Sequence, residues 1–499
     1  MMGKEESQQP QLFYTGINLE QRVRANHPLR QIARVLDLSF AYNKVKESYG
    51  YNGNVSVPPP VILKLMLLLV FYNVRSEREL MDTLPERLDW LWFLGYDIDS
   101  EMPDHSILSK ARNRWGVDVF QELFERVVWQ CVEAGLVNGT KIFVDASLIE
   151  ANASNNSVVD RGSLRRHINE SYPKLEERLD DRESTKENER ENKDGDCDKG
   201  GRVNDRHIST TDPEASIVRQ GSGKARLQYK THRTVDGAHK VITSTEVTPG
   251  AVNEAHRLME AIDQHHENTR RSAEVVIADS KYGTKENYLS CYDRGIKAHM
   301  PDLKSAQEKD NRRADIFPAA AFIYDDVTDT YVCPQGGRLK RRSHHKSRDS
   351  SDYGISGKIC DACELREQCT KSKSGRTIHR ENRQNELDIM LEEARSFASW
   401  RDIKQRQHFM EGSFGNATRY GFKRSRWRRL WRVRIQDYLI AAIQNVMILI
   451  RHKTTGKLAE VITLQKRRSL MIVERAQLWA RNISDLFFGK SLKWMDAGC

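Results

Sequence analysis

Two short apolar runs, each ending near an aspartate, constrain the fold more than any other feature of this sequence. The first is KIFVDAS, with Asp145, and the second is AEVVIADSKYG at 273–283, with Asp279. Both are short and rich in β-branched residues, so they predict buried strands. Between them, LQYKTHRTVDGAHKVITSTEVTPG predicts two strands joined by a turn at 236–237, and residues 253–265 predict a helix. Strand, hairpin, helix and strand in this order predict a mixed α/β sheet.

A region with helical spacing precedes this sheet. Residues 27–135 carry several helix start signals, including the prolines at 58–60. The apolar run at 61–74 includes Lys64 and is shorter than the roughly 20 residues that cross a bilayer. We therefore expect a buried helix there and no membrane partner. The first residues, MMGKEESQQP, lack the apolar segment of a secretion signal, so we expect a cytoplasmic protein with reduced thiols.

Positive charge is concentrated in one segment. The chain has a formal net charge of +10, and residues 419–434 (RYGFKRSRWRRLWRVR) contain no acid. Large aromatic rings lie among the bases, and a helix face that serves only solubility does not need them. We therefore favour phosphate binding over a solvated basic face. The candidate DNA-binding residues are Arg419, Lys423, Arg424, Arg426, Arg428, Arg429, Arg432 and Arg434.

A third acid completes a candidate metal site. Asp145 and Asp279 stand at the ends of predicted strands, at the rim of a sheet, where open α/β folds place their chemistry. Glu411 lies between Phe409 and Phe414, and a helix could present it inward. Three acids brought together repel one another unless a cation compensates. Oxygen ligands suit Mg²⁺ or Mn²⁺, and two such ions can clamp the attacking and leaving oxygens of a phosphodiester.

The order of these motifs resembles that of one protein family. VDAS around Asp145, the hairpin segment, IADSKYG around Asp279 and HFMEGSFGNATRYGFKRSRWRR around Glu411 resemble the catalytic domain of DDE transposases of bacterial insertion sequences. The resemblance extends to the N-terminal helical region and to STTDPEAS at 209–216. It implies an α/β fold with an RNase H-like mixed sheet and flanking helices, interrupted by insertions, plus an all-α N-terminal domain. Relatives often carry Lys or Arg seven residues after the glutamate, where this chain has Thr418.

The resemblance also implies a function. Asp145, Asp279 and Glu411 would be the metal-binding catalytic triad of a Mg²⁺-dependent transposase. Such an enzyme cleaves double-stranded DNA at the element ends and joins the freed 3′-hydroxyl to target DNA. Synapsis of two ends implies a homo-oligomer in the active complex. Two alternatives stay open: a nuclease or recombinase on the same scaffold, and a catalytically silent DNA-binding protein or repressor derived from a transposase.

Half of the cysteines are clustered in sequence. Cys333, Cys360, Cys363 and Cys369 are four of the eight cysteines in the chain. Cys360 and Cys363 form a C-x-x-C knuckle, which in a reducing compartment is more often a zinc site than a disulfide. A regular zinc ribbon has two such knuckles, but Cys333 has no second cysteine near it in sequence. Thiols without a metal are therefore the alternative. We expect a structural Zn²⁺ site, separate from the catalytic acids.

These signals together predict a division of the chain. Residues 180–202 contain one apolar residue, Cys197, so this stretch cannot bury a core. The predicted parts are a flexible N-terminus at 1–26, a helical DNA-binding domain at 27–135, the first part of the catalytic domain at 141–309 with a charged insertion at about 160–206, a cysteine-bearing insertion at 310–381, the last part of the catalytic domain at 382–455, and a C-terminal extension at 456–499.

Overall fold

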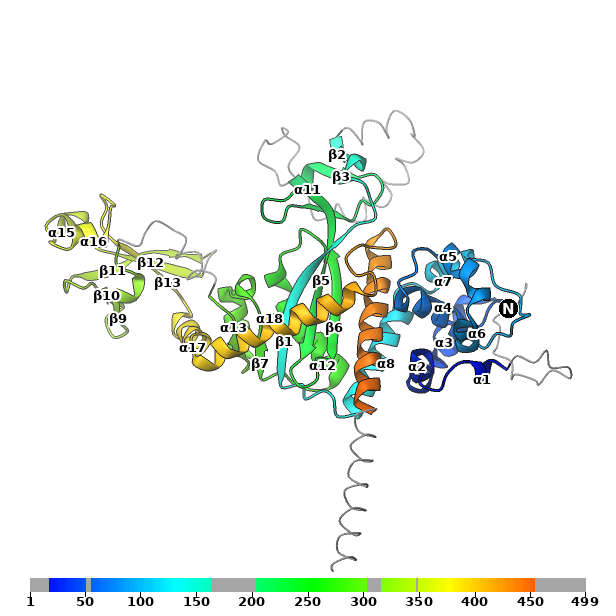
Figure 1. The fold of residues 1–499 in the computed structure, drawn as a ribbon. Coiled ribbons are helices and arrows are strands. Elements are labelled where there is room, and N and C mark those ends of the chain that lie inside the picture. The colour runs from blue at the N-terminus through cyan, green and yellow to red at the C-terminus, as the bar shows by residue number, and fades with distance from the viewer. Residues whose placement is uncertain (1–17, 51–54, 163–202, 303–315, 347–348, 454–499) are drawn as a thin grey trace, which may run out of the picture.

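The computed structural model describes residues 18–50, 55–162, 203–302, 316–346 and 349–453. The predictions for the first 17 residues, for most of the charged insertion, for Cys197 and for the extension at 456–499 lie outside these ranges. The described parts form an elongated arrangement in which a mixed sheet lies between a helical region at one end and a smaller sheet at the other (Figure 1).

The mixed sheet has the order of an RNase H-like fold. Its central strand β1 (Lys141–Glu150) pairs antiparallel with β5 (Arg226–Asp236) on one side and parallel with β7 (Val275–Ile277) on the other. Strand β6 (Ile242–Pro249) extends the antiparallel side, and β8 (Lys297–His299) extends the parallel side. The short strand β4 (Ser216–Val218) pairs with the start of β5. The mixed sheet predicted from the sequence is therefore confirmed.

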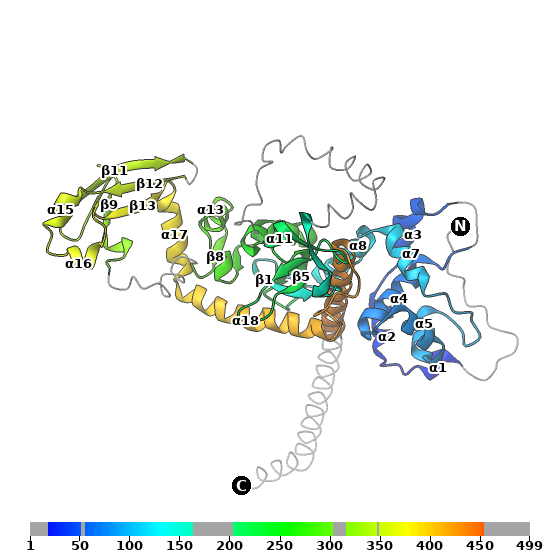
Figure 2. The same cartoon turned by 90° about the horizontal axis from the view of Figure 1, so that it is seen from above.

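Helices cover both faces of this sheet because both faces are apolar. Ile142 and Val144 of β1 pack in one cluster with α12 (Leu258–Thr269) and α13 (Lys285–Asp293). On the opposite face, Phe143 packs against Phe409 of the long helix α18 (Phe397–Thr418), with ring centroids 4.7 Å apart. Side chains alternate between the faces along a strand, so the odd-numbered residues of β1 face α18. Figure 1 shows α18 crossing in front of the sheet, and Figure 2 shows it running along one edge of the molecule.

The N-terminal part is entirely helical in the residues that the structure describes. Its core is the apolar helix α4 (Pro59–Phe71), which confirms the buried helix predicted at 61–74. The helices around it are α1 (Leu19–Arg22), α2 (Pro28–Val35), α3 (Phe40–Val45), α5 (Glu77–Thr83), α6 (Leu88–Leu94), α7 (Ser106–Trp115) and α8 (Asp118–Glu133). α1 lies within the segment predicted as a flexible N-terminus.

A long helix, Leu430–Lys453, joins the helical region to the sheet. By length and composition it could span a membrane, but 78% of its apolar window is buried inside the protein, as in a core helix. Its buried residues Leu439, Ile440 and Ile443 share one hydrophobic core with α4 and with β1. In the sequence, Ile435, Leu439, Ile443, Val446 and Ile450 follow one another at helical spacing, which predicts a helix that packs on the core. All five are buried, which confirms that prediction.

The cysteine-bearing insertion contains a second sheet that the sequence did not predict. Its strands run in the order β13 (Thr377–Glu381), β12 (Ser350–Gly354), β11 (Arg338–His345), β10 (Thr330–Val332) and β9 (Ile323–Asp325), all antiparallel. Two short helices, α15 (Gly357–Asp361) and α16 (Arg366–Cys369), follow β12, and α17 (Gln384–Ala394) leads back to α18. A small ribbon of β2 (Val158–Asp160) and β3 (His207–Ser209), with α11 (Val203–Arg206), lies beside the main sheet.

Candidate functional site

The structure brings Asp145 and Asp279 to the same level of the sheet. Phe143 of β1 pairs with Ile277 of β7 in parallel register, so Asp145 and Asp279 stand two residues beyond the same rung. Asp279 is the N-cap of the short helix Ser280–Tyr282, and its Oδ1 accepts a hydrogen bond from the backbone N–H of Lys281, 3.0 Å away. Asp279 follows the end of β7, as the sequence predicted. Asp145 does not end its strand, because β1 continues to Glu150 along β5, so the prediction of a rim position for Asp145 was wrong.

Burial and neighbouring acids perturb Asp145. Burial raises the pKa of its carboxyl to about 6, the nearby Arg406 guanidinium and the Ala146 N–H oppose the shift, and the negative charges of Asp279 and Glu254 add to it. A raised carboxyl pKa marks a place where additional positive charge is favoured.

Arg406 of α18 supplies such a charge in this structure. Its Nη1 lies 2.6 Å from Oδ2 of Asp145, and both side chains are largely buried. One turn earlier on α18, Asp402 accepts hydrogen bonds from Lys141 Nζ at 2.9 Å and lies 2.8 Å from His299 Nδ1. Ion pairs to β1 and β8 therefore fix the inward face of α18 over the sheet.

Glu411 lies on the other side of α18. It is five residues after Arg406, which turns its side chain by about 140° around the helix axis. The Glu411 side chain is exposed, and its Oε1 accepts a hydrogen bond from Gln407 Nε2 at 3.1 Å. The structure thus brings together Asp145 and Asp279 but not Glu411. Across the described ranges, no three His, Cys, Asp or Glu side chains are arranged to hold a metal ion.

Three further residues at this site were missed from the sequence. Glu254 is buried, and its Oε1 accepts from Lys230 Nζ and Lys281 Nζ, each at 3.1 Å. Lys281 lies inside the quoted motif IADSKYG, and Arg406 lies two residues before the quoted motif around Glu411, so both could have been noticed from the sequence. Glu254 carried no such signal, because its place beside the aspartates depends on how the β6–α12 connection folds.

Two family models match the chain. Residues 17–114 match a transposase domain (DUF772), and residues 332–450, which include Glu411 and the four clustered cysteines, match a transposase DDE domain. Both matches are to transposase domains, and they confirm the resemblance to DDE transposases. No curated protein matches it. It resembles a solved piggyBac transposase synaptic complex with hairpin DNA at 10% identity and a TM-score of 0.37, over 86% of this chain and 76% of that chain. This likeness is too weak to carry an argument.

The basic segment of the transposase contacts its own chain more than the sequence suggested. Arg426 donates to the carbonyl of Val74 and to Asn73, Arg432 Nη2 donates to Asn113 at 2.9 Å, and Arg434 Nε donates to the carbonyl of Val247 at 3.1 Å. The segment therefore joins the helical region to the main sheet. Its remaining bases, Arg419, Lys423, Arg424, Arg428 and Arg429, are exposed.

The rings in this segment pack inside the protein. Tyr420 stacks on Phe71 with centroids 6.1 Å apart, and Phe422 is fully buried. Trp427 Nε1 donates to Glu77 at 3.0 Å, and the Arg112 guanidinium lies 4.1 Å from the Trp427 ring centroid. The interpretation that these rings favour phosphate binding was wrong, because they hold the segment against the helices.

Some of the exposed bases line a groove. It has a volume of about 540 Å³, and Arg226, Arg424 and Arg428 lie along it with Asn152, Asn155 and Thr211. Arg428 Nε donates to the carbonyl of Asn152 at 3.1 Å, and Arg226 pairs with Glu150 at 3.3 Å. The groove presents a positive, hydrogen-bonding surface of the kind that DNA phosphates need.

The clustered cysteines of the transposase meet in the insertion. Cys333, Cys360, Cys363 and Cys369 line one pocket of about 280 Å³. Burial raises the pKa of the Cys369 thiol, Arg376 opposes the shift, and the other three thiols add to it. The four sulfurs are thus neighbours, although they do not form a metal-holding group in this arrangement. Cys131 and Cys291 are buried elsewhere.

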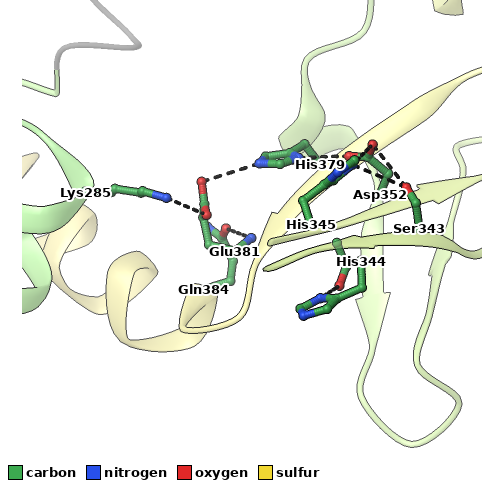
Figure 3. Close-up of polar contacts among 9 residues, drawn as sticks. Lys285, Ser343, His344, His345, Asp352, His379, Glu381 and Gln384 are labelled. Atoms are coloured by element: carbon green, nitrogen blue, oxygen red, sulfur yellow. Dashed lines mark hydrogen bonds and ion pairs between the residues drawn. The ribbon is translucent and has the colours of Figure 1, made fainter. Parts of the chain in front are cut away.

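A chain of polar side chains links the insertion to helix α13 (Figure 3). Asp352 of β12 lies between His345 Nε2 and His379 Nδ1, each 2.9 Å from one of its carboxylate oxygens. The other nitrogen of His379 is 3.5 Å from Glu381, which contacts Lys285 of α13 at 3.1 Å. Hydrogen bonds from His379 and His345 lower the pKa of Asp352. These contacts fix how the insertion is attached to α13.

Proposed function

We propose that this transposase cleaves double-stranded DNA at the ends of an insertion sequence and joins the cut strand to target DNA. The observation that carries the proposal is that Asp145 and Asp279 each lie two residues beyond the rung that joins Phe143 to Ile277, close enough for the charge of Asp279 to act on Asp145. Two neighbouring carboxylates are what phosphoryl transfer by bound cations requires. Glu411, within the DDE-domain match, is the predicted third acid.

The two aspartates fit a divalent cation, and Glu411 in its present position does not. Burial, and to a lesser extent the charges of Asp279 and Glu254, raise the pKa of Asp145, and a bound Mg²⁺ or Mn²⁺ would offset both effects. When bound, such a cation would activate a water or a 3′-hydroxyl for attack on phosphorus. The chain's own residues would hold the DNA: Arg424 and Arg428 line the basic groove, and Lys281 extends from the rim beside Asp279.

Zinc binding by the insertion is a separate proposal. The convergence of four thiols on one pocket supports a structural Zn²⁺ site, in which the four would bind the ion as thiolates. Elemental analysis of protein purified without chelator should find about one zinc per chain, and a Cys360→Ser, Cys363→Ser variant should lose it. A stable wild-type protein without zinc would contradict this proposal.

The experiment that tests the proposed function uses labelled DNA with candidate element ends, with and without Mg²⁺. A transposase cuts at the ends and joins the freed strand to a second DNA. Cleavage without joining would favour the nuclease or recombinase alternative, and binding without cleavage would favour the silent DNA-binding protein. A homo-oligomer in the active complex is part of the proposal and would appear as two element ends held in one particle.

A further inference from the structure

An exposed aromatic pair begins the outward face of α18. The side chain of Phe397 is 76% exposed and that of Trp400 is 56% exposed. Their rings are stacked, with centroids 5.6 Å apart and an interplanar angle of 22°. By contrast, Ser399 and Asp402 on the inward face are fully buried. Two large aromatic side chains exposed next to each other form an apolar surface patch, and such patches are typical of binding sites.

This face continues to Glu411. Phe397, Trp400, Lys404, Gln407 and Glu411 follow one another at intervals of three and four residues, so they form one stripe along α18. Trp400 lies about 16 Å along the axis from Glu411, at 1.5 Å per residue. Figures 1 and 2 both show α18 at the outside of the molecule, with no described element over this side.

The charge around the pair suits a polyanion. Arg395, Arg401 and Lys404 are exposed beside it, and Glu392 is the exposed acid just before them. Arg401 lies 3.7 Å from Asp402, but that carboxylate is already bound to Lys141 and His299. The positive amino end of the α18 dipole adds to the same field.

We propose that Phe397 and Trp400 form a stacking platform for unpaired DNA bases, with Arg401 and Lys404 holding the adjoining phosphates. In a duplex the bases cover one another's faces, so only bases at a cut or unwound end can stack on a ring. Such ends are what cleavage produces. This inference rests on the proposed function. It specifies that the surface of α18 beside Glu411 binds DNA with unpaired bases.

The test measures binding of the full-length protein to a labelled oligothymidine of about 20 nucleotides and to a duplex of equal length, at one salt concentration. Trp400→Ala and Phe397→Ala should each weaken oligothymidine binding by at least about fivefold, since one lost stack has that effect. Duplex binding should change less than about twofold, because the basic groove is intact. Trp400→Phe keeps a ring and should restore most of the binding.

Trp129→Ala is the matched control. Trp129 is 44% exposed on α8, where its Nε1 donates to Glu133, so its loss removes an exposed indole far from α18 in sequence. It should leave both affinities unchanged. Trp400→Ala protein that binds oligothymidine as tightly as the wild type would overturn the platform. So would a dimer that dissociates on the Trp400→Ala change, since the pair would then join two copies of the chain. Wild-type protein that binds no DNA at all would instead refute the proposed function.

Discussion

The guanidinium of Arg406 lies 2.6 Å from the carboxylate of Asp145. This contact ties the inward face of α18 to the central strand and places a fixed positive charge where a catalytic cation would be needed. Glu411 meanwhile faces outward from the same helix. Arg406 therefore competes with any cation for Asp145.

The first prediction follows from this competition. Arg406→Gln should bind Mn²⁺ more tightly than the wild type, by about tenfold or more, because a unit charge next to the ligand is removed. Titration followed by electron paramagnetic resonance measures this affinity without any need for activity. Arg401→Gln changes an exposed arginine on the same helix and serves as the control. Equal or weaker Mn²⁺ binding by Arg406→Gln would show that the arginine does not occupy a cation's place.

The buried ion pair between β5 and the long helix should be essential for stability. Arg233 and Asp437 are almost fully buried 2.6 Å apart, and Thr231 also donates to Asp437 at 2.7 Å. Asp437→Ala leaves the guanidinium unpaired and should lower the free energy of unfolding by about 3–5 kcal/mol. Glu260→Ala breaks the exposed pair with Arg257 and should cost less than about 1 kcal/mol. Urea denaturation compares the two, and equal losses would disprove the distinction.

His232 should make the fold sensitive to mild acid. Burial lowers its pKa to about 4, and the charge of Lys230 contributes. The unfolded chain binds this proton near pH 6.5 and the folded chain does not, so stability is unaffected above pH 6.5 and falls as the pH drops toward 4. Between pH 6.5 and pH 4, the free energy of unfolding of the wild type should fall by about 3 kcal/mol more than that of His232→Gln. Parallel stability profiles would contradict the assignment.

The basic segment should divide into DNA-binding and structural arginines. Arg424→Ala with Arg428→Ala should flatten the salt dependence of DNA binding, by about 0.9 in log–log slope for each lost phosphate contact. Arg426→Ala should leave the slope unchanged but destabilise the protein by about 1.5–3 kcal/mol, since Arg426 bonds to Asn73 and to the Val74 carbonyl. A slope lowered equally by Arg426→Ala would place DNA at the domain junction instead.

The strand pattern was sufficient to predict the sheet and the closeness of two acids. Asp145 and Asp279 follow apolar runs whose burial is evident from their composition, and adjacent parallel strands bring them to one level. The long helix at 430–453 was predictable for the same reason, since its apolar spacing continues without interruption. The end of the first strand was misplaced, because β1 continues past Asp145 to Glu150.

Other features depend on tertiary packing and left little trace in the sequence. Glu411 was predicted to face inward. Asp402 and Phe409 determine which side of α18 packs on the sheet, and the sequence alone allowed several rotations of the helix about its axis. β11 was missed because its sequence, RLKRRSHH, is mostly basic and contains one apolar residue, so it lacks the apolar alternation that predicts a strand. The rings at 420–431 could equally have faced DNA or protein until the neighbouring helices were in place.

The central claim is that Asp145 and Asp279 form the core of a cation-dependent DNA-cleaving site. Glu411 and Glu254 are the two candidates for a third acid. Alanine at Glu411 should abolish cleavage if α18 turns this residue toward the aspartates in the DNA complex. Alanine at Glu254 should have the larger effect if the present arrangement is the active one.

The most direct measurement is the rate at which purified protein cuts labelled element-end DNA in Mg²⁺, for the wild type and for Asp145→Ala and Asp279→Ala. Each variant should stay folded and bind the DNA at least as well as the wild type, because a negative charge near a polyanion is removed. Each should cut slower by several orders of magnitude, since a cation ligand is lost. A folded Asp145→Ala or Asp279→Ala protein that cuts element ends at close to the wild-type rate would contradict the account.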